Sequence, residues 1–156
     1  MSARKAIDIL LVEDNPGDVR LTLEAFRDAQ VPNQLNWVTN GVDALAYLRR
    51  EGAHVGATCP DLILLDLKLP RKDGREFLQE LRADRALQHL PVVVLTSSFA
   101  EEDMVRASES RANAYLTKPF DMDSFVEIAR SIDRFWQTIS HHPPASSQPG
   151  AESGIR

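Results

Sequence analysis

Five short apolar runs recur along most of the chain, and segments with a different periodicity separate them. The runs lie at residues 7–13, 35–38, 61–66, 91–96 and 114–117. Runs of Val, Ile and Leu without strict alternation are typical of strands that are buried on both faces, as in parallel sheets. We therefore expect five parallel strands.

Helical spacing of apolar residues follows each run. Val19, Leu23 and Phe26 set the pattern after the first run, and the weakest pattern is the polar segment 101–110. Five strands that alternate with five helices predict a doubly wound α/β domain with right-handed crossovers. From about Ser140 the composition changes to His, Pro, Ser and Gly, so we expect a domain at 1–138 and a flexible tail at 139–156.

Composition narrows the function classes. The 156 residues carry a net charge of −5 and no Lys/Arg-rich block, which argues against nucleic-acid binding. No apolar run approaches the roughly 18 residues of a membrane-spanning helix, so we expect no membrane association. The lone Cys59 excludes an intramolecular disulfide and a multi-cysteine metal site. We expect a cytoplasmic protein.

Four of the runs end on residues that suit phosphate chemistry. Glu13 and Asp14 follow the first run, Asp66 ends the third, Thr96 ends the fourth, and Lys118 follows the fifth. In an open parallel sheet, ligands bind outside the carboxyl ends of the strands. The pattern therefore predicts that three carboxylates, a hydroxyl and an ammonium meet at one edge of the sheet.

These residue types suit phosphoryl transfer. Two like charges about 4 Å apart repel by roughly 4 kcal/mol at an effective dielectric near 20, so three carboxylates need a cation or protons. Mg²⁺ suits an all-oxygen site. Asp66 follows the most apolar run and is the candidate nucleophile toward phosphorus. Lys118 and Thr96 would then neutralise phosphoryl oxygens.

The chain resembles the response-regulator receiver domains of two-component signalling over about residues 6–138. The matching segments are 10–14 (LLVED), 64–70 (LLDLKLP), 73–74 (DG), 94–96 (VLT) and 115–119 (YLTKP). The resemblance implies a flavodoxin-like (βα)5 fold with strand order 2-1-3-4-5. It also implies that the protein is a phosphoacceptor with at most slow self-dephosphorylation, rather than an enzyme.

The resemblance assigns a role to each matching residue. Asp66 would be the phosphoacceptor, and Mg²⁺ or Mn²⁺ would bind Glu13, Asp14, Asp66 and the backbone carbonyl of Lys68. Thr96 and Tyr115 would form the conformational switch, although Tyr115 alone also fits a simple core aromatic. Lys118 would be the site lysine, aimed inward by a cis bond to Pro119. Ser97 and Ser98 would flank the phosphate.

The chain is also similar to the small stand-alone regulators that are paired with bacterial phytochromes. The similarity lies in segments 13–18 (EDNPGD) and 66–76 (DLKLPRKDGRE) and in the pair Phe135-Trp136. This implies a sensor histidine kinase, light-regulated in that group, as phosphoryl donor. The output would pass through protein contacts or a histidine phosphotransfer protein.

The aromatic pair on the last helix also suggests a contact surface. Adjacent helical residues point about 100° apart, so one of Phe135 and Trp136 should be partly exposed. We expect a homodimer through the face formed by the fourth helix (101–110), the fifth strand (114–117) and the last helix.

Two other functions compete with this interpretation. Aspartate-nucleophile phosphohydrolases use similar residues, but they carry a second acid two residues after the nucleophile, where this chain has Lys68. A nucleotide- or flavin-binding protein would need a glycine-rich loop after the first strand, where this chain has Glu13 and Asp14.

Overall fold

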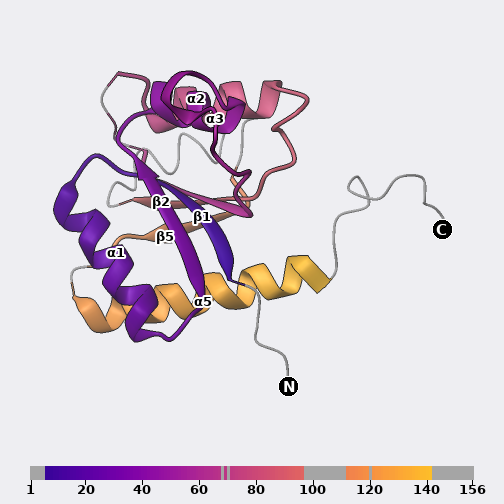
Figure 1. The fold of residues 1–156 in the computed structure, drawn as a ribbon. Coiled ribbons are helices and arrows are strands. Elements are labelled where there is room, and N and C mark those ends of the chain that lie inside the picture. Colours follow the sequence, from indigo (N-terminus) through magenta and orange to yellow (C-terminus); the bar gives the residue numbers. More distant parts are fainter. Residues whose placement is uncertain (1–5, 68, 70, 97–111, 120, 142–156) are drawn as a thin grey trace.

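The chain folds into one five-stranded sheet with helices on both faces, as seen in a computed structural model (Figure 1). The structure describes residues 6–67, 69, 71–96, 112–119 and 121–141. The elements in chain order are β1 Ile7–Val12, α1 Pro16–Asp28, β2 Asn33–Val38, α2 Gly41–Arg49, the 3₁₀ turn η1 Gly52–His54, β3 Leu62–Leu65, α3 Gly74–Ala83, β4 Val92–Thr96, β5 Ala114–Thr117 and α5 Met122–His141. The predicted helix at 101–110 lies outside the described residues.

All four strand pairings are parallel, and the strand order is β2-β1-β3-β4-β5. The predicted fold class and strand order are therefore confirmed. β2 begins at Asn33, two residues before the predicted start, because Asn33 already pairs with Ile7 of β1. α5 continues to His141, past the boundary expected at 138.

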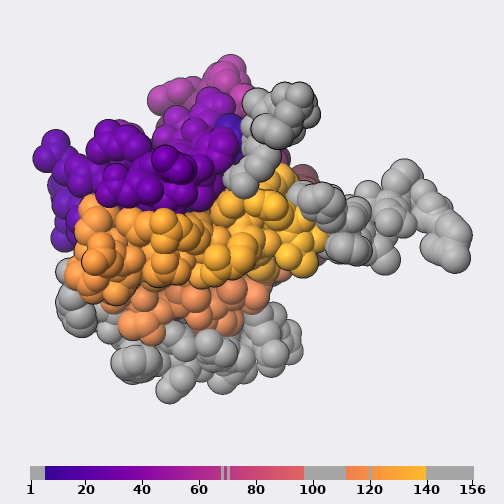
Figure 2. Space-filling model, turned by 90° about the horizontal axis from the view of Figure 1, so that it is seen from below, coloured from indigo at the N-terminus to yellow at the C-terminus, as the bar shows by residue number. Residues whose placement is uncertain are grey.

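Side chains of the central strands alternate between two apolar layers, as the two-residue period of a strand requires. Leu10, Ile63 and Val94 face the α2 and α3 side, where Phe77 of α3 packs. Ile9, Leu64 and Val93 face the α1 and α5 side, where Phe26 and Phe125 pack. Figure 2 shows α5 lying beside α1 across this second face. Because both faces are covered, only the strand ends and their loops remain for chemistry.

Helix starts are fixed by side-chain caps. Asn15 Oδ1 accepts from the N–H of Asp18 at the start of α1, and Pro16 occupies the first helical position. Asp73 and Glu76 form a capping box at the start of α3. The two helices follow the carboxyl ends of β1 and β3, so their caps lie at the edge of the sheet where those strands end.

In the part of the chain that the structure describes, no helix has the length and apolar character needed to cross a bilayer.

Candidate functional site

The strand ends bring the predicted residues to one edge of the sheet. Val12 of β1 pairs with Leu65 of β3, and Leu65 pairs with Val94 of β4. The N–H of Asp66 donates to the carbonyl of Val12 at 3.1 Å, which fixes the first residue after β3 against the end of β1. The N–H of Lys118 likewise donates to Thr96 O at 3.0 Å. The sheet ladder itself therefore positions the site.

The ammonium of Lys118 is surrounded by three carboxylates. Its Nζ lies 2.9 Å from Glu13 Oε1, 2.8 Å from Asp18 Oδ2 and 2.9 Å from Asp66 Oδ2. The Lys118 side chain is only 13% exposed, and Glu13 and Asp66 are buried. A lysine ammonium has three N–H donors, so these three bonds use all of them. Lys118 is therefore held rigidly, with one donor aimed at the candidate phosphoacceptor.

Asp18 is the site residue that the sequence reasoning did not identify. It stands in the first turn of α1, where an acidic residue is ordinarily explained by the helix dipole. Its side chain reaches Lys118 across 100 residues of sequence. The available signal was its place in a helix that starts immediately after Glu13 and Asp14, at the same edge of the sheet as Lys118.

Glu13, Asp14 and Asp66 form the cluster that fits a divalent cation. One oxygen from each lies within 4.8 Å of the others. Glu13 and Asp66 are buried, whereas Asp14 is exposed and opens the cluster to solvent. An all-oxygen, partly open set of carboxylates matches the preference of Mg²⁺ and Mn²⁺ for oxygen ligands with room for water. The predicted fourth ligand, the carbonyl of Lys68, lies outside the described residues.

Burial sets the protonation of this cluster. Dehydration, together with the charge of Asp66, raises the pKa of Glu13 to about 7 in spite of the hydrogen bond from Lys118. The hydrogen bonds from Lys118 to its three carboxylates raise the lysine pKa above its ordinary value and outweigh the cost of its own burial. The lysine is therefore positively charged, while Glu13 takes up a proton near neutral pH when no cation is bound.

The two predicted switch residues lie on the same side of the sheet. Thr96 is buried at the end of β4. Tyr115 is half-buried on β5 against the layer that faces α2 and α3, and its hydroxyl accepts from the N–H of Ala112 at 2.9 Å. Ser97 and Ser98 lie outside the described residues. Thr96 is the last residue of β4, and its carbonyl accepts from the N–H of Lys118, whose side chain contacts Asp66.

The prediction of a cis bond between Lys118 and Pro119 is wrong for this structure. No peptide bond between described residues is cis, and the Lys118–Pro119 bond is trans. The cis bond was expected to aim the lysine inward. The long lysine side chain reaches all three carboxylates from a trans backbone, so the inward aim does not depend on the cis bond.

One member of the aromatic pair on α5 was expected to be partly exposed, and the structure leaves both partly exposed. Phe135 and Trp136 both pack against the layer beneath α1 and α5 with part of their surface still accessible. The tryptophan that is more exposed is Trp37 on the edge strand β2, at 51%. The face proposed for dimerisation includes residues 101–110, which lie outside the described residues.

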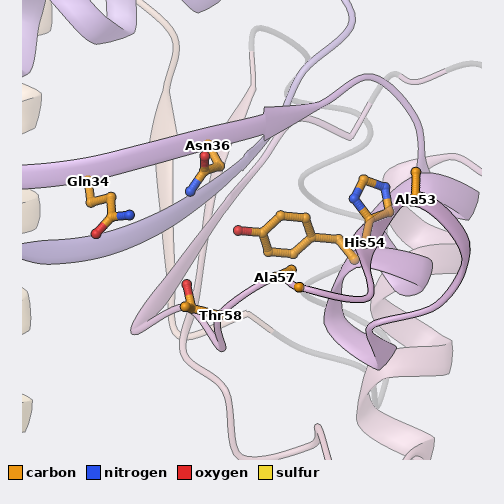
Figure 3. Close-up of a pocket in the computed structure, with 8 residues that line it drawn as sticks. Gln34, Asn36, Ala53, His54, Ala57 and Thr58 are labelled. Atoms are coloured by element: carbon orange, nitrogen blue, oxygen red, sulfur yellow. The ribbon is translucent and has the colours of Figure 1, made fainter.

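A separate polar cavity lies toward the amino end of the sheet and contains none of these residues. It has a volume of about 340 Å³ and is lined by side chains from β2, α2 and the segment that follows α2. Figure 3 shows Gln34 and Asn36 on the strand and His54 on the opposite side of the cavity, beside Ala53. Thr58 donates to Asp8, the second residue of β1, which places this cavity away from the carboxyl ends.

Comparison with known proteins supports the same family as the motifs. The Rcp1 response regulator of Synechocystis is 40% identical over 128 residues, which cover 82% of this chain and 87% of Rcp1. The structure of the phosphorylated cyanobacterial phytochrome response regulator RcpA superposes with a TM-score of 0.77 at 43% identity, covering 86% of this chain and 96% of RcpA. A Mn²⁺-bound structure of Rcp1 superposes with a TM-score of 0.73 at 39% identity, covering 83% and 94%.

The family pattern described as the response regulator receiver domain matches residues 9–130. This span contains Glu13, Asp14, Asp66, Thr96 and Lys118, together with every strand end that builds the cluster. The strand order and the convergence of these residues agree with that match. The chain therefore belongs to the response regulator receiver domain family.

Proposed function

We propose that this protein is a stand-alone response regulator that accepts a phosphoryl group on Asp66 from a sensor histidine kinase. One observation carries the proposal. Asp66 directly follows the fully buried strand β3, and its Oδ2 lies 2.9 Å from the charged amine of Lys118 in a cluster that suits a divalent cation. The alignment with Rcp1, which spans most of both chains, supports a regulator that consists of the receiver domain.

In the proposed reaction, a carboxylate oxygen of Asp66 attacks the phosphorus of a phosphohistidine. The new P–O bond makes an acyl phosphate, and the P–N bond to histidine breaks, leaving the electron pair on the imidazole. Lys118 places an N–H donor where a phosphoryl oxygen develops charge, next to Asp66 Oδ2. A bound Mg²⁺ or Mn²⁺ would supply positive charge between the carboxylates and the phosphoryl oxygens.

The histidine kinase is proposed to be a phytochrome. The support is the 43% identity to a protein described as a cyanobacterial phytochrome response regulator. A histidine phosphotransfer protein is a proposed further partner, because a phosphorylated aspartate can pass its phosphoryl group on to a histidine. The cytoplasmic location and slow self-dephosphorylation stay predictions.

Phosphorylation is proposed to act through Thr96 and Tyr115. The buried Thr96 hydroxyl would turn toward a phosphoryl oxygen, and Tyr115 would exchange its hydrogen bond with Ala112 for a new position. The proposed homodimer would form through residues 101–110, β5 and α5. Light scattering with and without phosphodonor tests it, and a monomer in both states at micromolar concentrations would reject it.

The proposed function is tested by incubation with Mg²⁺ and acetyl phosphate, followed by intact mass measurement. The wild type should gain one phosphoryl group only with Mg²⁺, and Asp66→Asn should gain none. Asp28→Asn is a matched control, because Asp28 is an exposed residue at the far end of α1. No adduct on folded wild type would contradict the proposal, and rapid consumption of the donor without adduct would favour a phosphohydrolase.

A further inference from the structure

Lys118 shares two of its three partners with the candidate cation site. Glu13 and Asp66 belong to the group of carboxylates that fits a divalent cation, and each also accepts a hydrogen bond from the lysine. Asp18, the third partner, is not a member of that group. The three bonds of the ammonium are therefore not equivalent when a cation approaches.

A cation and the ammonium would share the carboxylates of Glu13 and Asp66. Glu13 Oε1 accepts from Lys118, and its Oε2 accepts from the N–H of Asn15 at 3.2 Å, so both oxygens are already engaged. A divalent cation bound to Glu13 and Asp66 would repel the ammonium, because Lys118 Nζ lies 2.9 Å from an oxygen of each of these carboxylates. Cation binding would therefore weaken the bonds of Lys118 to Glu13 and Asp66.

Asp18 can keep the lysine during this change because the backbone of α1 fixes its position. The N–H of Asp18 donates to Asn15 Oδ1 at 3.1 Å, and its carbonyl accepts from Thr22 Oγ1 at 2.8 Å. The Asp18 side chain is 26% exposed, so its charge is less dehydrated than those of Glu13 and Asp66. Its 2.8 Å bond to Lys118 is independent of the cation ligands.

We propose that Asp18 is a positioning residue that holds Lys118 when a divalent cation takes over Glu13 and Asp66. Asp18 offsets the lysine charge, keeps the amine beside Asp66, and so lets the ammonium and the cation occupy the site together. This inference rests on the proposed function, because it requires that the carboxylate cluster binds a cation.

The experiment measures Mn²⁺ affinity of the full chain without phosphodonor, from the electron paramagnetic resonance signal of free Mn²⁺. Asp18→Asn keeps the shape of the side chain and removes its charge. We expect about tenfold weaker binding, the size typical of residues that orient metal ligands. Asp18→Glu should restore part of the affinity. Glu24→Gln removes one charge from the same helix at a site away from Lys118 and should leave affinity unchanged.

A second pair of variants separates an effect through the lysine from a direct effect on the cation. In Lys118→Met, the further change Asp18→Asn should weaken Mn²⁺ binding by a smaller factor than it does in the wild type. An equal or larger factor would show that Asp18 attracts the cation directly and would overturn the inference. Unchanged affinity of folded Asp18→Asn would overturn it too, while the proposed function stands. Failure of the wild type to bind Mn²⁺ would overturn the proposed cation site itself.

Discussion

The sheet carries a polar region at each end, and the two regions balance their carboxylates differently. At the amino end, Asp8 Oδ2 accepts from the hydroxyl of Thr58 at 2.9 Å, and Asp61 Oδ2 accepts from the N–H of Asp8 at the same distance. These partners are neutral. At the carboxyl end, Glu13, Asp18 and Asp66 share the single ammonium of Lys118. The carboxyl end therefore gathers three carboxylates around one ammonium, whereas the amino end holds its two carboxylates with neutral donors.

This difference shows which kind of polar region marks function in this fold. The amino end has the 340 Å³ cavity, whose lining contains no carboxylate, together with hydrogen bonds that hold a loop to the sheet. The carboxyl end has buried charges that cost stability and that a cation or a phosphoryl group would rebalance. The gathering of three carboxylates around one largely buried ammonium, rather than the volume of a cavity, distinguishes the candidate site.

The largest expected effect comes from removing the ammonium. Lys118→Met leaves three carboxylates without their shared cation, and breaking a buried ion pair costs about 3–5 kcal/mol. We expect a loss of this order in the free energy of unfolding, measured by urea at pH 8 in EDTA, with Mg²⁺ restoring part of it. Lys72→Met is the control, because its pair with Glu80 is partly exposed and should contribute less than about 1 kcal/mol. Equal stability of Lys118→Met and wild type would contradict the prediction.

The fold was predictable because each strand is an uninterrupted apolar run. The runs ending at Val12, Leu65 and Leu95 must be buried on both faces, and only a parallel sheet between helices satisfies them. The strand order and the switch role of Thr96 and Tyr115 came from resemblance to a family. The choice of Asp66 as candidate nucleophile and the meeting of the site residues at one edge followed from the position of each at a strand end.

What the sequence did not predict depends on how elements approach one another. Asp18 looks like an ordinary helix-start acid until the first turn of α1 is placed beside Lys118, which follows β5. The trans bond at Pro119 depends on the path of the loop, which local sequence does not determine. The exposure of Trp37 on β2, at 51%, also follows from tertiary packing, because it depends on which elements cover that edge strand.

The second-largest expected effect is a fall in the free energy of unfolding with rising pH, caused by Glu13 at the carboxyl end. Burial raises the pKa of Glu13 from 4.5 to about 7, so between these values the folded state binds a proton that the unfolded state has lost. Stability without divalent cation should therefore fall as pH rises from about 5 to 8, by about 3 kcal/mol for a shift of this size. Urea unfolding in EDTA at several pH values measures it. Glu13→Gln should remove this fall, and an unchanged slope in that variant would contradict the assignment.

A smaller loss of stability is expected when a glycine near the carboxyl-end site is replaced by alanine, and none when a glycine near the amino-end cavity is replaced. A Cβ at Gly74 would lie 2.6 Å from Leu67 Cα and 2.7 Å from Asp66 O, so Gly74→Ala must displace the backbone beside the phosphoacceptor. We expect a loss of about 1–3 kcal/mol and slower phosphorylation by acetyl phosphate. Gly56→Ala, beside the amino-end cavity, has no atom within 4 Å of the added Cβ and should change neither quantity. Normal phosphorylation of Gly74→Ala would show that the loop adjusts freely.

The smallest effect is expected from removing a hydrogen bond at the amino end of the sheet. Thr58→Val keeps the shape of the side chain but removes the hydrogen bond to Asp8 Oδ2. Because Thr58 is exposed, water can replace the lost donor, and the loss of unfolding free energy should be about 0.5–1 kcal/mol. The rate of phosphorylation should not change, because this contact lies at the opposite end of the sheet from Asp66. A slower rate in a folded Thr58→Val variant would mean that the two ends are coupled through β1, and the contrast between them would then describe structure but not function.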